Sequence, residues 1–157
     1  MIIDYETFIG NFAFRRVPHA DVPGVLRQMD TEGIDRALVS GLECVTYRNV
    51  QAGNEILAKG LRGADDRLMG AAVVNPIYPR AAEDARHCLV DLGMVALRLL
   101  PNYHGYTLGE EVEAPGLRDV MAVAADLAVP VSITFEIEDS RQHHLLFQLI
   151  ELEPADV

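Results

Sequence analysis

Glu6 and Arg98 offer the clearest chemistry in this sequence. Glu6 lies in the N-terminal stretch IIDYETFIG, and Arg98 lies in the apolar run MVALRLL. A carboxylate in such surroundings can act as a general base, bind a metal ion or pair with a buried cation. A guanidinium can pair with that carboxylate, or it can bind a substrate carboxylate through two parallel hydrogen bonds. The residues alone leave all of these roles open.

Histidines and one cysteine add candidates for proton transfer and nucleophilic attack. His104 lies in PNYHGY, and His143 and His144 lie in DSRQHH. Imidazole titrates near neutral pH, so His104 and one of the adjacent pair could move protons, although exposed loop histidines without function are the alternative. Cys44 could form a nucleophilic pair with His104. A small buried thiol is the role that we expect for it instead.

Short apolar strands and longer amphipathic helices must position these side chains. Strands are predicted at 1–4, 35–40, 68–74, 94–100 and 130–135, several of them apolar on both faces as buried parallel strands are. Helices are predicted from an N-cap at Asp21, then at about 47–61, 81–92 and 117–128, with Gly33, Gly63 and Gly93 at C-caps. The βα unit repeats roughly every 30 residues, which predicts parallel strands with right-handed crossovers.

This rhythm fits either an open doubly wound sheet or a closed barrel. The first βα turn, FIGNFAFRRVPHAD, lacks the glycines of a dinucleotide-binding turn, which favours the barrel. Function in a barrel gathers at the C-terminal ends of the strands. Asn75 lies at such an end, and the loop tyrosine Tyr103 could line a pocket there.

Composition excludes several classes of partner. The 157 residues carry a formal net charge of −11, whereas nucleic acids and anionic membranes require a basic surface. No apolar run approaches the roughly 20 residues of a spanning helix, and the acidic N-terminal stretch does not resemble a signal peptide. Two cysteines form neither a disulfide framework nor a zinc motif. We expect a cytoplasmic protein that binds neither nucleic acid nor membranes.

Four segments, in order and spacing, resemble the amidohydrolase-related family of the amidohydrolase superfamily, which includes aminocarboxymuconate-semialdehyde decarboxylase-like enzymes. IIDYETFIG is similar to its first strand, DRLMGAAVVNP to its third, GMVALRLLPNYHGYTL to its fourth and LAVPVSITFE to its fifth. The resemblance implies an α/β fold of the (β/α)₈ TIM-barrel type, with residues 1–157 holding about the first five strands and four helices as the N-terminal part of one domain. It also implies that Asp4, Glu6 and Phe8 point into the barrel. Alternation along the fifth strand places Ser132, Thr134 and Glu136 on the same inner side.

The metal site that the resemblance implies is altered in this sequence. Family members have two histidines on strand 1 and one on strand 5, where this chain has Glu6, Phe8 and Thr134. Glu6 would be acceptable as a metal ligand, because some decarboxylases of the family have Glu-x-His on strand 1. Phe8 has no donor atom, and a threonine hydroxyl is a poor zinc ligand. We expect either no cofactor or a weakly held divalent metal, zinc or manganese, with Glu6 as a ligand.

The resemblance implies a hydrolase or decarboxylase that acts on a small carboxylate-bearing or cyclic substrate. Glu6 and His104 are the expected catalytic groups. The expected substrate-binding groups are Arg98, Asn75, Thr134, Glu136, Tyr103 and His144. Two alternatives stay open: a metal-independent lactonase-like hydrolase, and a non-catalytic degenerate barrel that serves as a binding or structural subunit.

Five strands cannot close a barrel that usually needs about 250 residues. An open half-barrel would expose two strand edges and an apolar face. We therefore expect that the sequence is part of a longer barrel. The alternative is a natural half-barrel that completes itself as a homo-oligomer.

Overall fold

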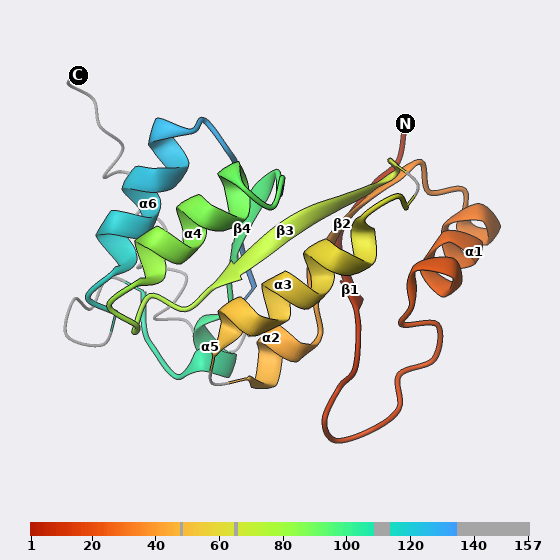
Figure 1. The fold of residues 1–157 in the computed structure, drawn as a ribbon. Helices are drawn as coiled ribbons and strands as arrows, with labels where there is room; N and C mark the ends of the chain where they lie inside the picture. Colours follow the sequence, from red (N-terminus) through yellow and green to blue (C-terminus); the bar gives the residue numbers. More distant parts are fainter. Residues whose placement is uncertain (48, 65, 109–113, 135–157) are drawn as a thin grey trace.

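The described part of the chain contains a parallel five-stranded sheet. The computed structural model describes residues 1–157 except 48, 65, 109–113 and 135–157, so Glu136, His143 and His144 lie outside the described residues. The strands are β1 (Ile3–Ile9), β2 (Arg36–Gly41), β3 (Leu68–Val74), β4 (Ala96–Leu99) and β5 (Val131–Ile133), paired in the order β1-β2-β3-β4-β5 (Figure 1). Parallel strands in sequential order, joined by helices, confirm the predicted fold class: this is the first part of a (β/α)₈ barrel.

Four longer helices follow the strands as predicted. They are α1 (Val22–Glu32), α3 (Val50–Leu61), α4 (Ala81–Val90) and α6 (Leu117–Asp126); the one-turn helices α2 (Glu43–Thr46) and α5 (Pro101–His104) were not predicted. The Asp21 cap is confirmed, because its Oδ1 accepts a hydrogen bond from the Gly24 N–H at 2.7 Å. Gly33 ends α1 with φ 69°, a left-handed conformation that favours glycine. Helices α3, α4 and α6 lie along one side of the sheet in Figure 1.

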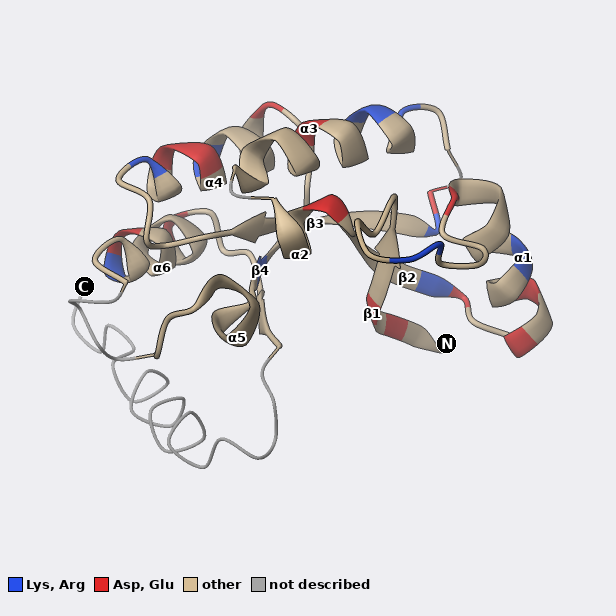
Figure 2. Ribbon diagram, turned by 90° about the horizontal axis from the view of Figure 1, so that it is seen from below, with Lys and Arg blue, Asp and Glu red and all other residues tan. Residues whose placement is uncertain are grey.

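Alternation along the strands separates two apolar layers. Outward-facing residues such as Val39, Ala72 and Leu97 belong to the main core against the helices. Inward-facing Leu38, Ala71 and Ala96 form a small cluster on the opposite face of the sheet. Figure 2 shows the charged residues mostly on helices and loops, with β3 free of them along its length. Charged side chains on the inner face are therefore exceptions that need a physical account.

An irregularity in β1 changes which of its residues point inward. Asp4 pairs with Ala37 and Thr7 pairs with Val39, so two residues of β1 oppose Leu38 and the strand bulges at residues 5–6. Ala37 and Val39 face the helical layer, so Asp4 does too, and its Oδ2 accepts a hydrogen bond from Thr7 Oγ1 at 2.9 Å. The predicted inward position of Asp4 is therefore wrong. Phe8, beyond the bulge, does face the interior, paired with Ser40.

The side chain of Asn54 hydrogen-bonds to β3 beyond the point where the backbone pairing of β3 with β2 ends. Residues 37–39 pair with residues 68–70, and beyond them the backbone pairing of these two strands ends. At Val73, Asn54 of α3 replaces the missing neighbour: its Nδ2 donates to the Val73 carbonyl at 2.8 Å, and its Oδ1 accepts from the Val73 N–H at 3.0 Å. Asn54 is 1% exposed, so both bonds lie away from water. One carboxamide thus satisfies both backbone groups of a buried strand residue.

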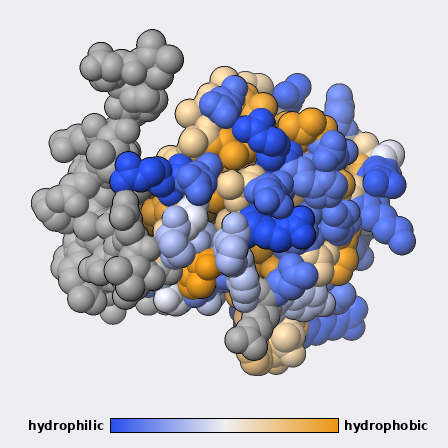
Figure 3. Space-filling model, turned by 60° about the vertical axis from the view of Figure 1, so that its left-hand side comes forward, coloured by the Kyte–Doolittle hydropathy of each residue, from blue (hydrophilic) through white to orange (hydrophobic). Residues whose placement is uncertain are grey.

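The outer surface mixes polar and apolar side chains. The face in Figure 3 is mostly hydrophilic, with hydrophobic residues in separate patches. Among the described residues, no helix combines the length and apolar character that a membrane span requires.

On this surface His87 of α4 joins two acidic side chains. Its Nδ1 lies 2.7 Å from the Asp91 carboxylate, and its Nε2 lies 2.9 Å from the Glu55 carboxylate on α3. A carboxylate can only accept, so this arrangement suits the doubly protonated imidazolium. The hydrogen bonds to Asp91 and then to Glu55 raise the pKa of His87, and the bond from His87 lowers the pKa of Glu55.

Replacing Asn54 with Leu should destabilise the protein. The change leaves the Val73 N–H and carbonyl buried without partners, and each such group costs about 1–3 kcal/mol. We expect the free energy of unfolding, from urea denaturation, to fall by roughly 2–5 kcal/mol in total. The exposed Gln28 of α1 provides a control, because Gln28→Ala should change it by less than about 0.5 kcal/mol. Equal effects of the two substitutions would contradict the role of Asn54 as the hydrogen-bond partner of the Val73 backbone.

Replacing His87 with Gln should lower the thermal midpoint in a pH-dependent way. The raised pKa means that the stabilisation is fully present below the unfolded-state pKa of about 6.5 and is lost as the pH rises through the folded-state value. The lowered pKa of Glu55 means that its share is present above its own unfolded-state pKa and is lost as the pH falls through the folded-state value. The wild type should therefore exceed the variant most near pH 6, by a small margin because water screens both ion pairs. Circular dichroism melts at several pH values test this, and a difference that does not vary with pH would exclude the imidazolium.

Candidate functional site

Arg98 of β4 is a buried cation on the inner face of the sheet. Its exposed fraction is 0%, its Nη2 donates to the carbonyl of Tyr5 in the β1 bulge, and its Cζ lies 5.0 Å from the centre of the Phe8 ring. Nε and Nη1 are buried and have no hydrogen-bond partner among the described residues. Burial lowers the pKa of Arg98, and the negative charges of Glu6 and Asp4 oppose that shift. Because a guanidinium stays protonated in proteins, a positive charge with unused donors lies in the interior.

The exposed side chain of Glu6 and the half-buried side chain of Thr134 meet across the curled sheet. Thr134 follows β5, its N–H continues the β4 pairing by donating to Leu99, and its Oγ1 donates to Glu6 Oε1 at 2.7 Å. β1 and β5 are the two edges of the described sheet, so this contact shows that the sheet curls until its edges approach. An ion pair of Glu6 with Arg98, one of the roles that the sequence left open, is not among the described ion pairs, and the bulge carbonyl accepts from the guanidinium instead.

The donors in this part of the interior do not fit the metal that the resemblance implies. Phe8 presents a ring to Arg98, and the hydroxyl of Thr134 is already engaged as a donor to Glu6. Among the described residues, no group of three or more histidine, cysteine, aspartate or glutamate side chains is arranged to hold an ion. Glu6 is the only family-type donor left at the three positions, and a positive guanidinium lies close by.

His104 and Cys44 are tied to each other in a way that does not make a nucleophile. The imidazole Nε2 of His104 bonds to the Cys44 carbonyl at 2.9 Å, so Nε2 carries the proton and the buried Nδ1 keeps the lone pair. Burial lowers the pKa of His104. The Cys44 thiol donates weakly to the Val50 carbonyl and to Asn54, and burial, followed by the charge of Glu43, raises its pKa to about 12. The described contacts give both residues structural roles, and catalysis by His104 stays a prediction.

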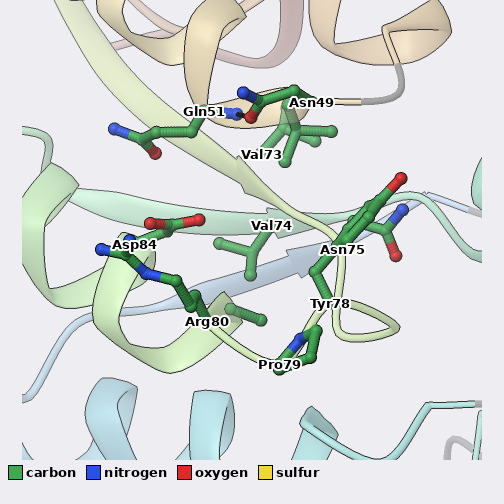
Figure 4. A pocket seen from close by; sticks show the side chains of 11 residues that line it. Asn49, Gln51, Val73, Val74, Asn75, Tyr78, Pro79, Arg80 and Asp84 are labelled. Carbon is green, nitrogen blue, oxygen red and sulfur yellow. Dashed lines mark hydrogen bonds between the residues drawn. The ribbon is translucent and has the colours of Figure 1, made fainter.

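No described hydrogen bond or ion pair joins Asn75 or Tyr103 to Arg98. Tyr103 on α5 is 59% exposed. Asn75 is 7% exposed, its Oδ1 accepts from the Ile77 N–H at 3.2 Å, and it lines a groove of about 740 Å³ between the starts of α3 and α4. In Figure 4, Asn49 and Gln51 lie on one side of this groove, with Arg80 and Asp84 on the other. The described contacts thus bring Glu6, Arg98 and Thr134 together, and the substrate-binding roles of Asn75 and Tyr103 stay predictions.

Glu43 is a buried carboxylate that the sequence reasoning missed. It follows β2, is 3% exposed, and accepts a hydrogen bond from the Asn11 N–H at 2.8 Å. A side chain at Gly10 would place its Cβ 2.1 Å from Glu43 Oε2, so Gly10, with φ +123°, makes room for the carboxylate. An acidic residue inside the apolar sequence GLECV was the available signal. Its contacts join the loop after β1 to the loop after β2.

Comparison with solved structures finds barrels that share this fold. A probable 2-pyrone-4,6-dicarboxylic acid hydrolase from Acinetobacter baumannii, with citric acid bound, has a TM-score of 0.65 and 18% identity over 96% of this chain and 54% of that one. An amidohydrolase II structure has a TM-score of 0.64 and 18% identity over 85% and 50%. A Ruminococcus gnavus sialic acid aldolase has a TM-score of 0.57 and 19% identity over 96% and 50%. The chain therefore spans about half the length of these structures.

A family comparison agrees with the fold and with the motifs. No curated protein matches the sequence. The family model for amidohydrolases matches residues 4–152, which is nearly the whole chain and includes both Glu6 and Arg98. The chain belongs to the amidohydrolase family.

Proposed function

We propose that this protein is an amidohydrolase-family hydrolase that binds a small carboxylate-bearing substrate at Arg98. One observation carries the proposal: Nε and Nη1 of a buried guanidinium have no described partner. An unpaired buried donor is unfavourable by about 1–3 kcal/mol, which a bound carboxylate would recover. Carboxylates are also the partners that match guanidinium geometry best. Because both nitrogens are buried, a ligand reaches them only after the side chains that cover them move.

Similar structures support a carboxylate as the ligand. The barrel from Acinetobacter baumannii is described as a probable hydrolase of a dicarboxylic acid, and it was solved with citric acid, a tricarboxylate. An acidic protein of formal net charge −11 has few ways to attract anions. A buried cation in the interior would provide local attraction that the overall charge opposes.

Glu6 is the residue that we propose as the general base. Thr134 fixes Oε1, and Oε2 accepts no other described hydrogen bond, so it is available to a water molecule. For a cyclic ester, the water oxygen would bond to the carbonyl carbon while Glu6 takes a proton from that water. The ring C–O bond then breaks, and the proton passes to the leaving oxygen. This step uses only water, the substrate and side chains of the protein, as the metal-independent lactonase-like alternative requires.

Phe8 and Thr134 favour the second candidate function, a non-catalytic barrel that only binds small anions. A family site that has exchanged two histidines for these residues has lost donors that catalysis in the family is expected to use. Binding at Arg98 is common to both candidates, and turnover separates them.

Replacing Arg98 with Met should abolish dicarboxylate binding. We expect isothermal titration with benzene-1,3-dicarboxylate to show binding to the wild type and a loss of about 100-fold or more in the variant, because the buried charge partner is gone. Arg98→Lys keeps the positive charge but lacks the two parallel donors of the guanidinium, so this variant should retain part of the affinity. Arg86, an exposed residue paired with Asp126, provides the control, since Arg86→Met removes the same charge from the surface. Binding that survives Arg98→Met would place the anion site elsewhere.

Replacing Glu6 with Gln should stop turnover while leaving binding in place. The amide cannot take a proton from water, so hydrolysis of 2-pyrone-4,6-dicarboxylate, followed by its ultraviolet absorbance, should slow by about 100-fold or more. The dissociation constant for benzene-1,3-dicarboxylate should change little. Glu83→Gln on the exposed face of α4 is the matched control. A wild type that binds dicarboxylates and shows no turnover of lactones would favour the non-catalytic candidate.

A further inference from the structure

We infer that the guanidinium of Arg98 takes the place that the amidohydrolase family gives to a metal ion. Glu6, Phe8 and Thr134 occupy the three expected ligand positions of this half of the barrel, and the first two have become surroundings for a fixed organic cation. The inference rests on the proposed function in one respect, because it concerns the same site. It adds that the side chain of Arg98, and not a bound metal ion, supplies the positive charge of the site.

The contacts around Arg98 serve its positive charge from three directions. The Phe8 ring lies under the guanidinium with 5.0 Å between its centre and Cζ, within the range of a cation–π interaction. The Tyr5 carbonyl, turned inward by the β1 bulge, accepts from Nη2. The carboxylate of Glu6, held by Thr134, contributes favourable charge. A residue that stands where the family has a histidine thus lies against the cation.

A second cation would be disfavoured at this place. Two positive charges at short distance in a partly buried site repel strongly, because the effective dielectric constant there is far below that of water. The available donors also cannot compensate: Phe8 offers none, and the Thr134 hydroxyl is turned toward Glu6. The interior therefore already holds the positive charge that it can accommodate.

The inference predicts that zinc affinity can be restored in steps. Phe8→His together with Thr134→His places two imidazoles beside Glu6, which is a set of three ligands suited to zinc. With Arg98 present, we expect the double variant to bind zinc weakly. Adding Arg98→Met should tighten binding by at least about tenfold, because it removes the competing cation. Adding Arg86→Met instead, at the exposed ion pair with Asp126, should change nothing.

The experiment is calorimetric titration of zinc chloride into the wild-type chain and the three variants, with circular dichroism to verify folding. We expect no saturable binding to the wild type up to about 1 mM zinc, and the order of affinities given above. One equivalent of zinc bound by the wild type, or no gain from Arg98→Met in a folded histidine variant, would overturn the inference. The proposed function fails separately, through loss of dicarboxylate binding in a wild type that still excludes zinc.

The wild type alone provides a second readout in case the histidine variants do not fold. The Nε–H of Arg98 should give a protected proton resonance, since it is buried, and its shift should stay constant as zinc is added. A displacement of that resonance that saturates with zinc would mean that the metal enters the place of the guanidinium. Such a displacement would overturn the inference whatever the variants do.

Discussion

The burial of one positive charge is the constraint around which the interior of this half-barrel is arranged. A guanidinium without solvent exposure requires acceptors and negative charge nearby, or the fold would lose several kcal/mol. The chain supplies them from β1, the strand at the opposite side of the curl. The β1 bulge, the inward Tyr5 carbonyl, the Phe8 ring and the carboxylate of Glu6 are parts of that one solution.

The curl of the sheet follows from the same contacts. Arg98 reaches from β4 to β1, and the Thr134 hydroxyl reaches from the end of β5 to Glu6. In an open flat sheet of this strand order, the first and fifth strands would be too far apart for side chains to meet. These polar contacts therefore act with the helical layer to hold the curvature that brings the strand ends together.

The fold and part of the site could be predicted from sequence because both depend on periodicity. Apolar strands, helix stripes and the Asp21 cap are local patterns, and the structure confirms them. The length of β1 was underestimated, since Glu6 and Thr7 interrupt its apolar character, and a bulge leaves no trace in a pattern of period two. That bulge turned Asp4 outward, against the prediction, and it gave Arg98 a backbone carbonyl as its partner, which no sequence pattern indicated. Helices α2 and α5 are too short for a periodic signal, and Glu43 became significant only when the glycine opposite it was seen in space. Phe8 and Thr134 were singled out because they stand at ligand positions of the family, yet only the structure could show what they contact.

The carboxamide of Asn54 also stands in for a neighbouring strand at one point of β3. Two neighbouring strands are normally about 4.8 Å apart because backbone hydrogen bonds fix that spacing. Beyond the last backbone pair of β2 and β3, side chains make the described contacts instead: Ser40 Oγ donates to the Ala71 carbonyl at 2.9 Å, and Asn54 of α3 bonds to both backbone groups of Val73. The spacing of these two strands beyond Gly70 is therefore not fixed by a ladder of backbone hydrogen bonds. An exchange of Asn54 would therefore act on the sheet itself, although this residue belongs to a helix.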